Sequence, residues 1–228
     1  MSLDDGIVQN APHLRVFNAS HNFLRRMGAP TNPQGWGTVR VLDLSYNQLE
    51  EVDSPLTIMP RNATVYLHGN PKLRYIDWSG QNVTFISSRA ICQFENLNTL
   101  KLAFNILTRV PSSLVNCRNL QLLDLTANLL TARSFAPSFG SLPNLQTLSL
   151  RNNSLGVVPA PICAVRSLQS LSLASTGISA LPACMANLTS LQTLDLSANP
   201  ITALPPWISS LSSLRILALN AMPQLTQT

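Results

Sequence analysis

One pattern of apolar and polar positions, LxxLxLxxNxL, recurs along this chain of 228 residues. It appears in the segments LRVFNASHNFL, VRVLDLSYNQL, LNTLKLAFNIL and LQTLDLSANPI, at 14–24, 39–49, 97–107 and 191–201. We count nine copies, which start at Leu14, Val39, Leu73, Leu97, Leu120, Leu145, Leu168, Leu191 and Leu214. Successive copies lie 23 to 25 residues apart, apart from one spacing of 34. The chain is therefore a tandem repeat with a period of about 23 residues.

The alternation inside each copy predicts a short β-strand. The first, fourth and sixth positions are apolar in all nine copies, and the residue between the last two would face the opposite side of the strand. The segment between copies reads LPxxIxxLxx, and its prolines can open a short helix or 3-10 turn. One repeat cannot bury its own apolar edge, so the repeats must stack, with parallel strands about 4.8 Å apart.

This pattern resembles the leucine-rich repeat family over essentially the whole chain, and the later half resembles its 23-residue LPxxIxxLxxLxxLxLxxN type. The resemblance implies an α/β solenoid: a right-handed horseshoe with a concave parallel β-sheet of about nine strands and a convex side of short helices, 3-10 turns and loops. It also implies an internal ladder of buried asparagines, made by Asn22, Asn47, Asn105, Asn128, Asn153 and Asn199. Gln81, Thr176 and Met222 depart from this ladder, so we expect a less regular backbone there.

We interpret residues 1–228 as a single repeat domain. Residues 1–13 read as the latter part of an upstream repeat, and we expect both ends to be truncated from a longer array. The long spacing is assigned to an inserted loop at 53–72, followed by a strand within LRYIDWSGQNV at 73–83. An alternative register places the third strand at Val65–Leu67, with Asn70 in the ladder.

Composition narrows the classes of function. Charged residues are only 11% of the chain, against a typical value of about 25%. The net charge of +5 comes from scattered arginines, whereas a nucleic-acid partner usually requires a dense basic stripe. The apolar runs fall far short of the roughly 18 to 20 residues that span a bilayer, so we expect no membrane insertion by this fragment.

No catalytic motif accompanies the repeat. The sequence lacks GxxxxGK[ST], GxGxxG, HExxH and GxSxG, and its three histidines lie far apart. We therefore expect no enzyme activity, no metal site and no cofactor.

Four cysteines leave two interpretations open. A bridge between neighbouring repeats is geometrically feasible for Cys92 with Cys117 or for Cys163 with Cys184. We prefer free thiols, because the repeat positions do not require the side chains to converge. N-x-S/T sequons permit N-glycosylation but do not indicate it, because their number is close to chance; they stand at Asn18, Asn62, Asn82, Asn152 and Asn187.

The residues that would face outward from the concave sheet are largest in the N-terminal half. We expect a protein or peptide partner to bind there, through His21, Asp43, Tyr46, Tyr75, Asp77, Lys101 and Phe104, with Arg151 further along. Tyr46, Tyr75 and Phe104 are the favoured anchors, because interface energy concentrates in large aromatic side chains. Tyr66 and His68 of the inserted loop form a second candidate.

Two locations fit such a recognition module. The low charge favours the ectodomain of a receptor-like or secreted protein, at the cell surface or outside the cell. The alternatives are an intracellular, cytoplasmic adaptor or scaffold, and the regulatory arm of an enzyme that lies outside this fragment.

Overall fold

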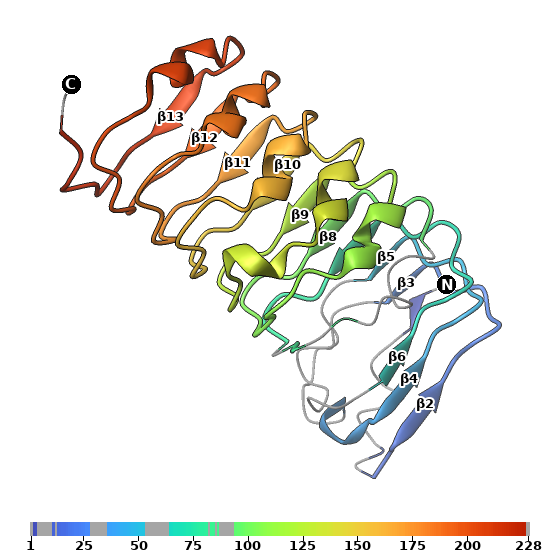
Figure 1. The fold of residues 1–228 in the computed structure, drawn as a ribbon. Helices are drawn as coiled ribbons and strands as arrows, with labels where there is room; N and C mark the ends of the chain where they lie inside the picture. Colours follow the sequence, from blue (N-terminus) through green and yellow to red (C-terminus); the bar gives the residue numbers. More distant parts are fainter. Residues whose placement is uncertain are drawn as a thin grey trace.

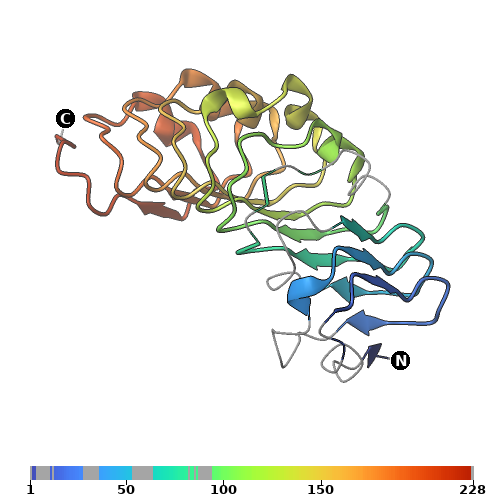
Figure 2. The same ribbon diagram turned by 90° about the horizontal axis from the view of Figure 1, so that it is seen from below.

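The structure, a computed structural model, describes residues 2–3, 11, 13–27, 36–52, 64–81, 83–84, 86 and 94–226. The repeats follow one another as stacked turns of a solenoid, here called coils (Figure 1). Figure 2 shows the coils arranged along an arc, with the 3-10 turns from residue 112 onward on its outer side. The predicted leucine-rich repeat solenoid is therefore confirmed.

The strands are short, and all the pairs between them are parallel. Each of the nine strands predicted from the repeat is present, as β2, β4 and β7 to β13. Four further strands, β1, β3, β5 and β6, appear in the N-terminal part. Their bounds are β1 Ser2–Leu3, β2 Val16–Asn18, β3 Arg26–Met27, β4 Val41–Asp43, β5 Glu51–Val52, β6 Thr64–Tyr66, β7 Tyr75–Asp77, β8 Thr99–Lys101, β9 Leu122–Asp124, β10 Thr147–Ser149, β11 Ser170–Ser172, β12 Thr193–Asp195 and β13 Ile216–Ala218.

The outer side of the coils carries 3-10 turns, and within the described ranges none of the helices is an α-helix. Four of these turns are immediately preceded by a proline, as the repeat predicts: Pro111, Pro159, Pro182 and Pro205. The turns are η1 Trp36–Thr38, η3 Ser112–Asn116, η4 Ala132–Ser134, η5 Pro137–Ser141, η6 Ala160–Ala164, η7 Ala183–Asn187 and η8 Pro206–Ser210.

The core is a continuous column of aliphatic side chains between the strands and the 3-10 turns. Leu100, Leu123 and Leu171 come from the strands and are fully buried. Ile162 and Met185 come from the turns and close the same core from the other side. Full burial of each such side chain stabilises the fold by about 1.5–3 kcal/mol, so the repeat itself supplies most of the driving force.

The strands form two sheets instead of the single sheet of about nine strands that we expected. A ten-stranded sheet has the order β1-β3-β5-β7-β8-β9-β10-β11-β12-β13, and a separate three-stranded sheet has the order β2-β4-β6. Figure 1 shows β2, β4 and β6 side by side at the N-terminal end of the solenoid.

The segment that we interpreted as an inserted loop, 53–72, contains one of these strands. Leu42 in β4 pairs with Val65 in β6, so the period of 23 residues continues there, and the alternative register is also present. Only 11 residues separate Val65 from Ile76 in β7, which is half a coil. Half a coil is too short to bring the chain back to the side of β6. The strand β7 therefore pairs with β5, and the three-stranded sheet ends at β6.

An asparagine ladder links the coils at the bend after each strand. In each typical step the amide group donates to carbonyl oxygens of its own coil and of the preceding coil. Asn128 Nδ2 lies 2.9 Å from Leu102 O and 3.0 Å from Leu125 O. Its Oδ1 accepts from the N–H of Leu107 at 3.0 Å. Asn47, Asn70, Asn105, Asn153 and Asn199 make equivalent bonds, whereas Asn22 is exposed and, within the part of the chain that the structure describes, bonds to its own coil.

Two of the departures from the ladder have different local solutions. Thr176 Oγ1 donates to Leu173 O at 2.6 Å and also lies 3.2 Å from Asn199 Oδ1. Asn199 Oδ1 accepts from the N–H groups of both Thr176 and Ile178. Gln81 Nε2 turns back to Ser79 O, and its buried Oε1 has no hydrogen-bond partner among the described residues. The ladder is thus interrupted at Gln81, next to the place where the sheets divide.

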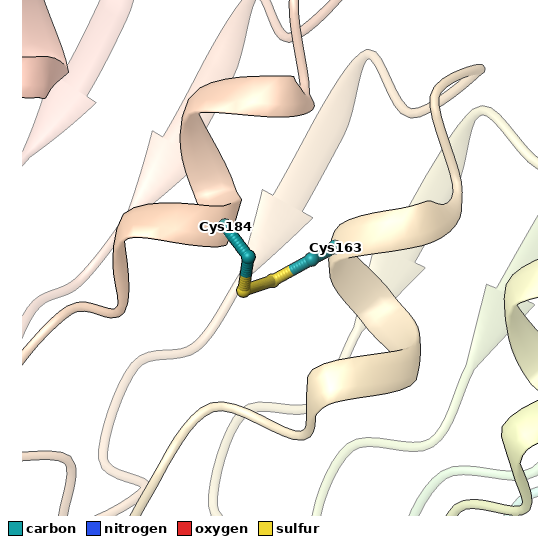
Figure 3. The surroundings of a disulfide bond; sticks show 2 residues. All are labelled: Cys163 and Cys184. Carbon is teal, nitrogen blue, oxygen red and sulfur yellow. A yellow bond between two sulfur atoms is a disulfide. The ribbon is translucent and has the colours of Figure 1, made fainter.

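Two cysteines are joined across neighbouring coils, which corrects our preference for free thiols. Cys163 in η6 and Cys184 in η7 form a disulfide with a Cα–Cα distance of 5.5 Å (Figure 3). The two 3-10 turns stack so that the side chains converge, although one cysteine follows its core residue and the other precedes it. Cys117 is buried, and Cys92 lies outside the described residues.

Replacing Asn128 by Ala should lower the free energy of unfolding by about 2 kcal/mol or more, because the buried N–H of Leu107 loses its acceptor. The matched control is Asn144→Ala, since the Asn144 amide donates to Arg118 O at the surface and water can replace it. The control should cost less than about 1 kcal/mol. Urea denaturation of both variants measures the difference, and equal losses would contradict a structural role for the ladder.

Candidate partner-binding surface

The residue just before each ladder position has a positive φ. Ten turns share this left-handed residue, including the turns of Gln81, Thr176 and Met222. At these three positions we expected a less regular backbone, but the residue before each has the same positive φ as in the other turns. Most of the ten are small: Gly69, Gly80, Ala127, Asn152, Ser175, Ala198 and Ala221. The three exceptions are aromatic: His21 at 55°, Tyr46 at 52° and Phe104 at 56°. Tyrosine and phenylalanine are uncommon in this conformation, so Tyr46 and Phe104 need a reason other than local preference, whereas histidine adopts it more readily.

Four rings join into a continuous row over the three-stranded sheet, here called the aromatic row: His21, Tyr46, His68 and Tyr66. The His21 and Tyr46 rings stack with centroids 4.4 Å apart. The Tyr46 ring then meets His68 edge-on at 5.0 Å, and His68 meets Tyr66 edge-on at 6.2 Å. Each such pair contributes about 0.5–1.5 kcal/mol beyond its buried area, which holds the row in place while half of Tyr46 stays exposed.

Gly69 makes room for the centre of the row. A Cβ atom at this position would lie 2.5 Å from Cδ1 of Tyr46, so any side chain would displace the ring. The backbone of the third coil therefore serves as the floor beneath Tyr46.

Asp43 places a negative charge beside the row. It pairs in register with Tyr66 on one side and with Asn18 on the other. Burial opposes ionisation of this carboxyl, but hydrogen bonds donated by Ser45 Oγ and N–H, together with His68 and His21, outweigh it and lower the pKa of Asp43. The carboxylate thus stays charged next to an exposed aromatic surface.

A second group lies on β7 and β8 of the ten-stranded sheet. Lys101 Nζ is 5.2 Å from the centroid of the Tyr75 ring and 3.9 Å from Asp77 Oδ2. Tyr75 donates to Asp77 Oδ2 at 3.1 Å. Burial raises the pKa of Tyr75, and hydrogen bonding with Tyr75 raises the pKa of Lys101. These three residues satisfy one another, so they offer a partner less than the aromatic row does.

The remaining candidates stand alone. Phe104 is 66% exposed in the turn after β8, between the turns of Gly80 and Ala127. Arg151 is exposed in the turn after β10. The structure therefore does not bring the favoured anchors Tyr46, Tyr75 and Phe104 into one cluster.

Sequence reasoning assigned Tyr66 and His68 to a separate loop site, and the structure places them in the same row as Tyr46. The signal that reveals this was present in the sequence: Val65, Leu67 and Asn70 repeat the pattern of Leu42, Leu44 and Asn47 at a spacing of 23.

The described residues contain no group of three or more His, Cys, Asp or Glu side chains that could hold a metal ion. In the same residues no helix is long and apolar enough to cross a membrane.

Models of repeat families match the C-terminal part of the chain. The model described as Leucine Rich Repeat matches residues 144–165, and the model described as Leucine Rich repeats (2 copies) matches residues 166–209. Chaoptin of Drosophila melanogaster is 30% identical over 149 residues, which cover 60% of this chain and 11% of chaoptin. The chain therefore corresponds to a small part of that relative.

Solved structures match over more of the chain. A leucine-rich repeat protein of Leptospira interrogans has a TM-score of 0.63 at 23% identity, covering 98% of this chain and 59% of that protein. The leucine-rich repeat ectodomain of the Arabidopsis thaliana receptor kinase GASSHO1/SCHENGEN3, solved in complex with CASPARIAN STRIP INTEGRITY FACTOR 2, has a TM-score of 0.56 at 29% identity. That match covers 90% of this chain and 24% of the ectodomain.

A repeating parallel sheet with 3-10 turns on its outer side defines a leucine-rich repeat solenoid. Together with these matches, it shows that the chain has the fold of leucine-rich repeat proteins, whose domains are commonly protein interaction modules.

The carboxyl group of Asp43 should titrate below the ordinary aspartate pKa in an NMR titration. Because its folded pKa is lowered, Asp43 contributes stability above its unfolded pKa and loses that contribution as the pH falls through the folded value. Ser45→Ala removes the side-chain donor and should raise the pKa of Asp43. An Asp43 pKa at or above the ordinary value in the unmodified protein would refute this account.

Proposed function

We propose that this chain is a recognition module that binds a protein or peptide on the aromatic row. The single observation that carries the proposal is the placement of Tyr46 at positive φ in the centre of the aromatic row, where most of the other coils have a glycine or a small residue. A non-glycine residue in this region costs roughly 1–2 kcal/mol whatever its size, and the exposed ring of Tyr46 adds nothing to the core in return. An exposed aromatic row that the fold does not need is best explained by contact with a partner.

The chemistry of the row indicates the kind of partner that fits. Tyr46 and Tyr66 are 50% and 44% exposed, and their rings would cover apolar side chains of a partner. Asp43 would attract a basic group at the edge of the same surface. We therefore infer a polypeptide segment that combines apolar and basic side chains.

A similar solenoid in a receptor ectodomain supports this role. The GASSHO1/SCHENGEN3 ectodomain was solved in complex with CASPARIAN STRIP INTEGRITY FACTOR 2, and its structural match covers 90% of the present chain. We infer by analogy that the present chain also serves as a binding part of a longer receptor-like or secreted protein.

The disulfide between Cys163 and Cys184 supports an extracellular or cell-surface location, because such bonds persist in oxidising compartments. The sequons at Asn18, Asn152 and Asn187 are on exposed residues and allow glycosylation there. Asn62 and Asn82 lie outside the described residues. An intracellular adaptor would need no such bond, and this second candidate rests only on the repeat type.

Changing Tyr46 and Tyr66 to Ala together should reduce binding of selected peptides at least tenfold, because aromatic anchors contribute about 2 kcal/mol or more each. The peptides come from selection of a random linear library on the immobilised chain, and biolayer interferometry measures their affinities. The matched control is Tyr75→Ala, since Tyr75 is held by Asp77 and Lys101 away from the row. Binding that survives the double change, or is lost with Tyr75→Ala alone, would reject the row as the site.

Protein purified from its native source should contain the Cys163–Cys184 peptide pair and glycans on Asn152 or Asn187, as read by mass spectrometry without reduction. Thiols at both cysteines with no glycan would favour the intracellular alternative. A glycan on Asn18 would leave the location intact but contradict the binding surface, because Asn18 lies beside Asp43 on the face of the row.

A further inference from the structure

A cavity of about 570 Å³ lies on the flank of the solenoid, between the coils that follow β8 and β9. Its apolar lining includes Val110, Phe135 and Ile86, whose side chains are all at least nine-tenths buried. Arg109 and Arg133 stand at its rim and are exposed. The volume is in the range of about 300–1,000 Å³ that small-ligand sites occupy. Ser112 and Ser134 add polar groups to a lining that is otherwise apolar apart from the two arginines.

The cavity results from a departure from the repeat. The β9 coil is longer than the period, since 25 residues separate Leu123 from Leu148, and the additional residues form the extra turn η4. This turn is fixed on both sides: Thr131 and Ser134 form a capping box, and Ser134 Oγ donates to Thr108 O at 2.7 Å. The hollow beside it is therefore held open by hydrogen bonds between neighbouring coils.

The two arginines are brought together by the backbone. The N–H of Val110 donates to Ser134 O at 3.0 Å. Arg109 and Arg133 immediately precede these two residues, so they occupy neighbouring positions on adjacent coils. Neither guanidinium forms a salt bridge with the described residues, and none of the residues that line the cavity is acidic.

The net positive charge of the chain is also concentrated in the part that contains the two arginines. Residues 1–95 contain eight basic and eight acidic residues, whereas residues 96–228 contain seven basic and two acidic ones. All of the net charge of +5 therefore belongs to the part that carries this cavity. Like charges on neighbouring coils repel each other, so Arg109 and Arg133 are poised for a shared anion.

We propose that the cavity binds a carboxylate that is attached to an apolar body, with Arg109 and Arg133 on the carboxylate and Val110 and Phe135 against the body. Guanidinium groups bind carboxylates through paired, charge-assisted hydrogen bonds. The apolar side chains select against a fully polar anion, because such a ligand would leave them in contact with water. Two sources supply this chemistry, a free amphipathic acid and the C-terminus of a polypeptide that ends in an apolar residue.

Isothermal titration calorimetry with octanoate tests the site on the full chain. Octanoate should bind, and 1-octanol and acetate should each bind at least tenfold more weakly, because each lacks one half of the ligand. Arg109→Gln with Arg133→Gln should weaken octanoate binding at least tenfold, as loss of charged hydrogen bonds implies. The source is distinguished by a peptide ending in Leu-Phe, tested with a free carboxyl and as the amide.

The matched control is Arg118→Gln with Arg166→Gln, which removes the same charge from exposed arginines outside the cavity. This control should bind octanoate as the unchanged chain does, and both pairs should keep the unfolding midpoint. The proposal is overturned if octanoate does not bind at millimolar concentration, if 1-octanol binds equally well, or if the two pairs of substitutions have the same effect. None of these outcomes bears on the aromatic row, so the cavity and the partner-binding surface are tested separately.

Discussion

The buried bend after each strand governs the rest of this structure. At that bend the backbone leaves the sheet, and its N–H and C=O groups face the core with no strand to satisfy them. One amide side chain solves the problem for two coils at once, as Asn128 does by accepting from Leu107 and donating to Leu102 and Leu125. Because each amide needs the coil before it, the ladder also fixes how closely and in what register the coils stack.

The division of the solenoid shows that ladder, sheet and period are one constraint. Between Val65 and Ile76 the chain completes only half a coil, and at the same place the ladder fails at Gln81 and the three-stranded sheet ends at β6. The strand β7 pairs instead with β5, so the ten-stranded sheet runs past the division and keeps the two parts together. The consequence is a separate N-terminal face, which carries the aromatic row.

Most of the fold could be predicted from the repeat, because apolar columns and ladder positions depend only on local spacing. Leu171 and Leu194 pair in the structure as their positions in the repeat require. The position of β6 was harder, since two registers compete within 53–72 and both strands exist. The contact of Tyr46 with His68, and of His68 with Tyr66, follows from the register that includes β6. The pairing of Cys163 with Cys184 and the cavity at Arg133 depend on how the 3-10 turns meet between coils, which spacing alone does not specify.

Both candidate sites lie where the chain departs from its own repeat. A repeat protein whose sequence served stability alone would have a small residue at every left-handed turn and the same length in every coil. Here His21 and Tyr46 replace small residues, and η4 lengthens the β9 coil. Neither change improves the core, which is equally well buried in the regular coils around Leu171 and Leu194. The regular coils therefore act as a rigid frame, and the departures from them are the positions at which contact with other molecules can have been selected.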